Sequence, residues 1–311
     1  LAITFTNKAA GELKERLRAM LGDTLGGDVN ASTFHSACVR MLRRDAERIG
    51  FPKSFTIYDS DDQQRVIKQI YKDLMIDDKF LPVKSAIGQI SSFKDKLLSA
   101  EDVAGEPFAN TKAQLVSKIY TAYAGRLKAA GAMDFDDLLL NVVRLFQEQE
   151  HLRALYGSRF QHILVDEYQD TNYLQSRFID LLSREHGQLM VVGDDAQSIY
   201  SWRGADMENI LSFTTRYPAA KTFKIETNYR SVPEILELSN AAIAANEVQI
   251  EKRLRSVRPT GEMPPALVPL NDDRMQAKFV AQRIRDLIEE GTDPNEIAVL
   301  YRAHFHSMEL Q

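Results

Sequence analysis

Two adjacent carboxylates, Asp166 and Glu167, directly follow the apolar run 163–165. A short apolar run of this kind predicts a buried strand, and open parallel sheets bind ligands at the carboxyl ends of their strands. One carboxylate could hold Mg²⁺, which prefers oxygen ligands, while its neighbour orients or deprotonates a water. A hydrophobic strand followed by Asp-Glu also occurs often by chance. The pair alone therefore fits either a catalytic site or a plain strand end.

A second polar segment, Gly193–Ala205, follows the next apolar run at 188–192. Its Gln197 could sense a phosphate. Tyr200 and Trp202 are two residues apart, so an extended backbone would present both rings on the same side. Exposed rings suit single-stranded nucleic acid, because each stacked base contributes about 1–3 kcal/mol. The alternative for Trp202 is a buried place in the core.

A third segment of interest is Asn228-Tyr229-Arg230-Ser231. Its arginine could reach the γ-phosphate of a nucleotide, and the tyrosine ring beside it could stack on adenine. An exposed turn without function is the alternative.

The elements around these segments alternate between strand and helix. Strands are predicted at residues 1–5, 162–165, 188–192, 266–269 and 297–301. Helices are predicted at 7–21, 35–49, 173–183, 233–245 and 277–288, with a Gly/Asp loop over 22–30. Such alternation is typical of an α/β fold with a parallel sheet. Residues 59–133 show helical periodicity and no convincing strand. A helix beginning at Asp134 carries acidic residues that capping alone could explain.

Composition narrows the class of protein. The 311 residues correspond to about two domains at roughly 150 residues each. The chain is 44% hydrophobic and 27% charged, which is ordinary for a globular protein, and its net charge of −5 argues against a globally basic nucleic-acid coat. The single cysteine, Cys38, permits no internal disulfide and no multi-cysteine zinc site, so a reducing compartment such as the cytoplasm is expected. The apolar runs are too short to span a membrane.

The order and spelling of five segments resemble the UvrD/Rep/PcrA-type superfamily 1 DNA helicases. The similarity runs from residue 1 to about 302 and is vaguest over 59–133, the counterpart of the family's helical insertion. The residues at Asp134–Leu139 also match the sequence typical of the family. The five segments are Thr4–Ala10, Thr33–Ser36, Val165–Asn172, Gly193–Ala205 and Asn228–Ser231.

This resemblance implies a RecA-like parallel sheet of the P-loop NTPase type. It implies a first RecA-like domain at 1–58 and 134–230, an all-helical insertion at 59–133, and part of a second RecA-like domain at 231–311. In the family, ATP binds between two such domains, and its hydrolysis drives movement 3′ to 5′ along one DNA strand.

The resemblance also assigns roles. Asp166 would hold Mg²⁺, Glu167 would activate the attacking water and Gln197 would couple the γ-phosphate to DNA. Tyr229 would stack on adenine and Arg230 would act as an arginine finger. The remaining residues would contact DNA: Phe5, Tyr200 and Trp202 in base pockets, with Thr33, His35 and Arg203 as further contacts.

Three departures from the family qualify the resemblance. No Gly-x-x-x-x-Gly-Lys-Ser/Thr loop occurs in the 311 residues. We therefore expect the chain to be an internal segment of a longer protein, to bind ATP poorly and to be inactive alone. The family's final motifs are also missing. His304 stands where the family often has Asn, which puts one DNA contact in doubt, and Ala196 replaces a frequent Asp.

The expected function is an ATP-dependent helicase in DNA repair or replication, with ATP and Mg²⁺ as cofactors. Expected partners are single-stranded DNA and single-strand/duplex junctions, together with repair or replication proteins, and no membrane. The sequence leaves the oligomeric state open. One alternative is a single-stranded DNA-binding protein without ATPase activity, and another is the helicase subunit of a helicase–nuclease recombination complex.

Overall fold

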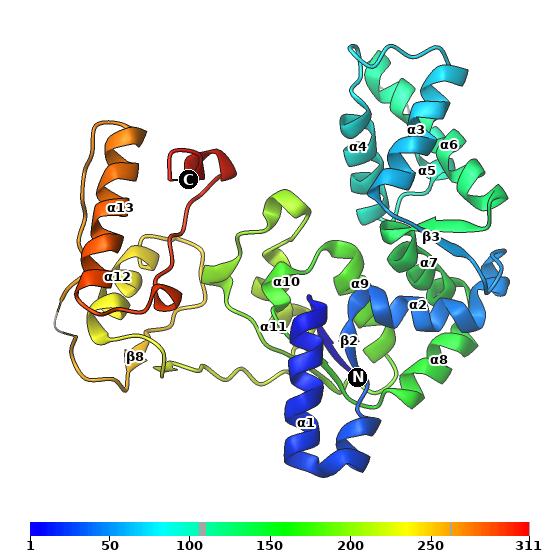
Figure 1. The fold of residues 1–311 in the computed structure, drawn as a ribbon. Coiled ribbons are helices and arrows are strands. Elements are labelled where there is room, and N and C mark those ends of the chain that lie inside the picture. The colour runs from blue at the N-terminus through cyan, green and yellow to red at the C-terminus, as the bar shows by residue number, and fades with distance from the viewer. Residues whose placement is uncertain (106–109, 262, 311) are drawn as a thin grey trace. The chain divides into compact units, whose positions relative to one another are not determined.

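The computed structural model describes residues 1–105, 110–261 and 263–310, with the side chain of Arg203 excepted (Figure 1). The chain forms two compact units. Unit 1 comprises Leu1–Phe223 with Val248–Glu251, and unit 2 comprises Lys224–Glu247 with Lys252–Gln311.

Unit 1 contains a four-stranded sheet in the order β2-β1-β5-β6, and every neighbouring pair is parallel. Its strands are β1 (Ala2–Thr4), β2 (Ala31–Thr33), β5 (Ile163–Val165) and β6 (Leu189–Val191). The predicted α/β class with parallel strands is thus confirmed. Because the strands are parallel, the segments that follow β5 and β6 start from the same edge of the sheet.

One face of this sheet packs on helices and forms the main core. Ile163 and Val165 are each 1% exposed, whereas Leu164 between them is 44% exposed, as expected for alternating strand side chains. Buried aromatic rings fill the space above, with Phe178 lying between Phe34 and Phe146. The helices of this layer are α2 (Phe34–Asp45), α7 (Phe135–Glu148), α8 (Glu150–Arg159) and α9 (Tyr173–Ser183).

A second hydrophobic core lies within the helices predicted for 59–133. It is built from side chains such as Ile67, Ile119 and Tyr120. The helices are α3 (Ser60–Asp73), α4 (Val83–Asp95), α5 (Ala100–Gly105) and α6 (Thr111–Ala129). At their base, β3 (Thr56–Tyr58) pairs in parallel with β4 (Ala132–Asp134), a strand that the sequence analysis missed because three residues are too few to show a period.

A buried lysine joins α4 to the start of α7. Lys94 is 1% exposed, and its Nζ lies 2.6 Å from Asp134 Oδ2 and 2.7 Å from Asp137 Oδ1. Tyr123 Oη also donates to Asp134 Oδ2 at 2.9 Å. Asp134 and Asp137 form the capping box of α7, so capping accounts for only part of their environment. Burial raises the pKa of Asp137 to about 7, although the Lys94 ammonium opposes this shift.

The structure corrects three predictions. The predicted loop at 22–30 is largely helical, because α1 (Asn7–Asp28) continues past a break at Gly22, where φ is 81°. The apolar segments 266–269 and 297–301 are not strands; Leu267 and Leu300 in them are each 94% exposed. Without a neighbouring strand to pair with, an apolar run does not form a sheet.

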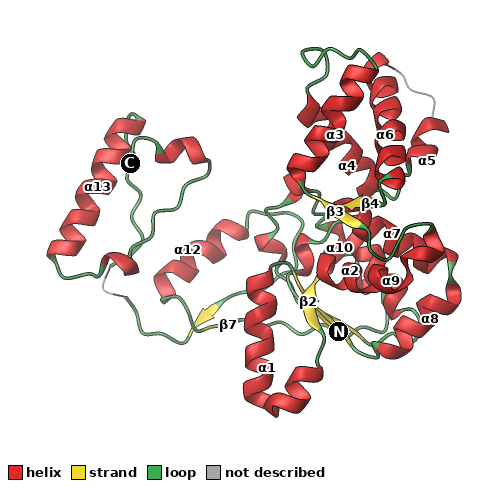
Figure 2. Ribbon diagram, turned by 45° about the vertical axis from the view of Figure 1, so that its right-hand side comes forward, coloured by secondary structure: helices red, strands yellow, loops and turns green. Residues whose placement is uncertain are grey.

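The remaining elements are short, apart from two helices of unit 2 (Figure 2). In unit 1 these are α10 (Glu208–Leu211) and α11 (Phe213–Arg216); in unit 2 they are β7 (Thr227–Asn228), α12 (Pro233–Ile243), β8 (Arg255–Ser256) and α13 (Asp273–Glu289). Short 3₁₀ turns span Ala46–Ile49, Tyr168–Asp170, Asp195–Gln197, Ser201–Arg203, Pro294–Glu296 and His304–Ser307. Along the described residues, none of the helices combines the length and apolarity needed to cross a bilayer.

Candidate functional site

The carboxylate pair lies at the carboxyl end of β5, where the strand stops abruptly. Asp166 still donates its backbone N–H to Ile3 O of β1 at 3.0 Å. Glu167 then turns into the left-handed region with φ 51°, and its N–H donates to Asp166 Oδ1 at 3.0 Å. Both side chains are exposed. The strand end therefore presents two adjacent carboxylates to solvent while its backbone remains anchored in the sheet.

The segment after β6 lies beside this pair. Tyr168 donates its backbone N–H to Val192 O at 2.9 Å, which joins the turn after β5 to the end of β6. The chain then passes through Asp194 into the 3₁₀ turn Asp195–Gln197, where Gln197 Nε2 donates to Asp194 Oδ2 at 2.8 Å. Gln197 is exposed. The structure thus brings the carboxylate pair and the Gln197 segment to one edge of the sheet.

The two aromatic residues of this segment are exposed. Tyr200 is 38% and Trp202 is 65% exposed, and their ring centroids are 6.4 Å apart at 43°. A buried core position for Trp202 is therefore excluded. The turn that carries them ends at Gly204, whose φ of 86° suits glycine. The predicted DNA contact through the Arg203 side chain lies outside the described part of the chain.

The predicted DNA-contact residues near β1 and β2 are less accessible. Thr33 is 8% exposed and caps α2, accepting from Ser36 N at 3.3 Å. Phe5 is half-buried, with its ring against Phe34. His35 is also half-buried, and burial lowers its imidazole pKa although the Asp136 carboxylate opposes this shift. This lowered pKa favours the neutral imidazole.

Tyr229 and Arg230 lie in unit 2 on an ordered turn. Asn228 Oδ1 accepts from the backbone N–H groups of Arg230 at 3.0 Å and Ser231 at 2.8 Å. Arg258 Nε donates to Tyr229 O at 3.2 Å. Tyr229 is 72% exposed and the Arg230 side chain is exposed as well. The segment thus forms an exposed turn, and the side chains of Tyr229 and Arg230 both face solvent.

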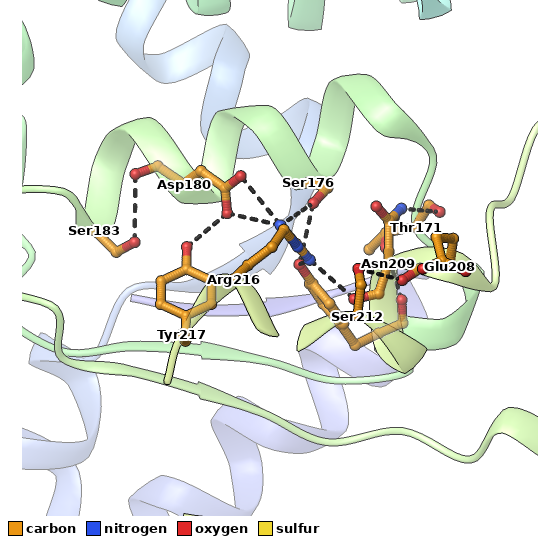
Figure 3. A network of polar contacts seen from close by, with 10 residues as sticks. Thr171, Ser176, Asp180, Ser183, Glu208, Asn209, Ser212, Arg216 and Tyr217 are labelled. Atoms are coloured by element: carbon orange, nitrogen blue, oxygen red, sulfur yellow. Dashed lines mark hydrogen bonds and ion pairs between the residues drawn. The ribbon is translucent and has the colours of Figure 1, made fainter. Parts of the chain in front are cut away.

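Behind the carboxylate pair, a polar network holds the turn against α9, α10 and α11 (Figure 3). Arg216 donates to Tyr168 Oη at 3.0 Å, to Ser176 Oγ at 3.0 Å and to Asp180. Asn209 Nδ2 donates to Thr171 O at 2.9 Å and to Thr171 Oγ1 at 3.2 Å. These contacts hold the inward-facing residues Tyr168 and Thr171, and Asp166 and Glu167 take no part in them.

The exposed Asp166 carboxylate suits the chemistry of a magnesium ion shared with nucleotide phosphates, because Mg²⁺ takes one or two carboxylates and keeps its other positions for phosphate and water. Within residues 1–105, 110–261 and 263–310, no group of three or more His, Cys, Asp or Glu side chains is arranged to hold a metal ion.

Residues 1–218 match the model of the UvrD/REP helicase N-terminal domain. The chain belongs to this family. Residues 223–311 match the UvrD-like helicase C-terminal domain.

Proteins named ATP-dependent DNA helicase PcrA, from Staphylococcus aureus strain NCTC 8325 and Staphylococcus epidermidis strain ATCC 12228, are each 42% identical to the whole chain. The chain spans 42% of the length of each of these two relatives. The UvrD/REP match covers every segment of unit 1 that carries a candidate site residue.

Sequence reasoning overlooked Gln169, which lies inside the quoted segment 165–172 and is 1% exposed. A polar side chain in a loop is ordinarily solvated. The sequence held no signal that this amide would be buried between two loops.

Proposed function

We propose that the chain is part of an ATP-dependent DNA helicase that moves 3′ to 5′ along single-stranded DNA and unwinds duplexes. The observation that carries the proposal is the grouping of the exposed Asp166–Glu167 pair, Gln197 and the exposed Tyr200–Trp202 rings on consecutive segments at one edge of the sheet. Such a grouping would put nucleotide chemistry next to base stacking. The family relationship supports the same activity.

On the nucleotide side, Asp166 would hold Mg²⁺, which neutralises phosphate charge when bound. Glu167 would accept the proton of the attacking water, and Gln197 would contact the γ-phosphate. Tyr229 would stack on adenine, and Arg230 would stabilise transition-state charge; an arginine finger contributes about 10³–10⁵ in rate. Phosphoryl transfer needs positioning more than covalent chemistry, and the anchored backbone of this turn provides it.

On the DNA side, Trp202 and Tyr200 would stack on bases, which suits a motor that must grip any sequence. Phe5, Thr33, His35 and Arg203 would line the same path. Because burial lowers the pKa of His35 and favours its neutral form, its contribution would be a hydrogen bond or a stacking contact rather than a charge.

We further propose that the sheet of unit 1 is RecA-like, with its first domain at 1–58 and 134–230 and a helical insertion at 59–133. Part of a second RecA-like domain would occupy 231–311. The protein would work in DNA repair or replication on strands and junctions, in the cytoplasm, in keeping with its single buried thiol.

One residue makes the DNA half of the proposal directly testable. Trp202 is the sole tryptophan of the chain, so the intrinsic fluorescence reports on this site alone. Titration with oligo(dT) should quench that fluorescence through ring stacking, and the affinity should fall as salt rises. Unchanged fluorescence at saturating DNA would exclude Trp202 from the binding path.

The nucleotide half needs the whole gene product, in which single-stranded DNA should stimulate ATP hydrolysis. Quenching of Trp202 by oligo(dT), with no hydrolysis by the whole gene product, would instead support the alternative of a single-stranded DNA-binding protein without ATPase activity.

A further inference from the structure

Gln169 connects the two loops of the candidate site through its side-chain amide. Its Nε2 donates to Glu167 Oε2 at 2.7 Å, and its Oε1 accepts from the backbone N–H of Asp194 at 3.0 Å. The amide orientation is dictated by these neighbours, since a carboxylate can only accept and a backbone N–H can only donate. One amide therefore joins the segment after β5 to the segment after β6.

The glycine at 193 permits this connection. A Cβ built on Gly193 would lie 2.6 Å from Gln169 Oε1 and 2.7 Å from Ile210 Cδ1. Any side chain at this position would displace the amide. Gly193 is thus required because its lack of a side chain lets its backbone approach Gln169 closely. Its φ angle does not itself demand glycine.

The connection continues from Asp194 to Gln197. The amide fixes the backbone of Asp194, whose Oδ1 accepts from Ala196 N at 3.0 Å and whose Oδ2 accepts from Gln197 Nε2 at 2.8 Å. A continuous hydrogen-bonded chain therefore runs from the Glu167 carboxylate through Gln169 and Asp194 to the Gln197 amide.

We propose that Gln169 is a positioning residue that orients the Glu167 carboxylate and holds it in a fixed relation to the Gln197 segment, so that hydrolysis responds to DNA bound at Tyr200 and Trp202. The proposal rests on the function proposed above. The Glu167 carboxylate is attached through several rotatable bonds, so it loses orientation when its hydrogen-bond donor is removed. Residues that hydrogen-bond to metal ligands and orient them typically contribute about 10- to 100-fold in metal affinity or activity. We expect a similar contribution from a residue that orients a catalytic carboxylate.

Two substitutions separate the parts of this connection. Gln169→Glu keeps the oxygen that accepts from Asp194 N but replaces the donor to Glu167 with a second carboxylate. Gln169→Ala removes both contacts. A purely structural role is tested by Asn209→Ala, which breaks the two hydrogen bonds to Thr171 in the same turn and leaves Glu167 untouched.

The experiment measures DNA-stimulated ATP hydrolysis of the whole gene product and its three variants. We expect kcat to fall about 10- to 100-fold in Gln169→Glu and Gln169→Ala, with KM for ATP and oligo(dT) affinity within two-fold of the parent. The DNA stimulation factor should also drop in Gln169→Ala. Asn209→Ala should lower the thermal midpoint and keep kcat within two-fold of the parent.

The outcomes separate the two proposals. If the parent shows no DNA-stimulated hydrolysis, the proposed function fails and the role of Gln169 fails with it. If the parent is active and Gln169→Glu keeps the parental kcat, the positioning role alone is overturned. If Asn209→Ala loses as much kcat as the Gln169 variants, the turn acts only as a structural unit and the positioning role is likewise overturned.

Discussion

Replacing Lys94 with methionine tests whether the buried ion cluster stabilises unit 1. The substitution keeps a long apolar side chain in place and removes the ammonium that lies between Asp134 and Asp137. Two carboxylates then remain in a site where Lys94 and Asp134 are each 2% exposed at the side chain. Removing one member of a buried pair typically costs about 3–5 kcal/mol, because the remaining charge has no counterion.

That cost corresponds to an increase of between about a hundred-fold and a few thousand-fold in the unfolding equilibrium constant. With a urea dependence of about 2–3 kcal/mol per molar, the midpoint should fall by at least about 1 M. The matched control is Lys96→Met, two residues further along the chain, where the lysine is exposed. That substitution should change the free energy of unfolding by no more than about 0.5 kcal/mol.

The deficit of Lys94→Met should depend on pH. Without the ammonium, the folded-state pKa of Asp134 rises above the ordinary value near 3.9, and that of Asp137, which burial already raises, rises further. The folded state then binds protons that the unfolded state has released, so the stability of the variant falls as pH rises through those pKa values. The difference from the parent should be largest near pH 8 and should shrink toward pH 5.5.

The single cysteine supplies the assay. Cys38 is 0% exposed in the main core, and burial raises the pKa of its thiol, so the native protein should react slowly with thiol reagents. Labelling of Cys38 across a urea series then reports the unfolding of unit 1. An unchanged midpoint for Lys94→Met, or a deficit that grows as pH falls, would refute the reasoning.

Three further predictions concern the candidate site. Glu167→Gln in the whole gene product should lower kcat for ATP hydrolysis by at least about 10²-fold with nucleotide binding retained; parental turnover would contradict the assigned role. Trp202→Ala should weaken the binding of fluorescein-labelled oligo(dT) by about 1–3 kcal/mol in anisotropy titrations, and because Trp202 is 65% exposed the thermal midpoint should not move. An NMR titration should place the pKa of His35 below the ordinary value of about 6.5. Protonation of His35 then opposes folding, so the stability that the neutral imidazole contributes is complete above about pH 6.5 and is lost as pH falls below it. A measured pKa above about 6.5 would show that the Asp136 carboxylate outweighs burial.

The sequence predicted the elements whose signals are local. Helix 173–183 was predicted with both ends correct. In the structure Asn172 and Gln175 form a capping box at its start, a local signal of helix initiation. The runs at 163–165 and 189–191 were recognised because apolar residues stop abruptly at polar ones. Strand β2 was missed, because Ala31-Ser32-Thr33 carries no apolar signal and is buried by contacts that lie elsewhere in the chain, with β1 and with helices α1 and α2.

Nonlocal contacts explain the remaining differences. The exposed apolar segments at 266–269 and 297–301 have the composition of strands, but strands also require neighbours. In the site, the exposed residues Asp166, Glu167, Gln197 and Trp202 could be chosen from their types. The role of Gln169 depends on a close approach between two loops that no pattern along the chain encodes.

The network around Arg216 in Figure 3 has a consequence for protein design. Within the turn after β5, Asp166 and Glu167 face solvent, whereas Tyr168 and Thr171 face inward to Arg216 and Asn209. The exposed residues of the segment can therefore take part in chemistry, whereas its inward-facing residues hold the turn in place. Grafting only residues 166–171 onto another parallel sheet would transfer the carboxylates without the anchors of their turn. A transplant that keeps its shape must also carry α10 and α11.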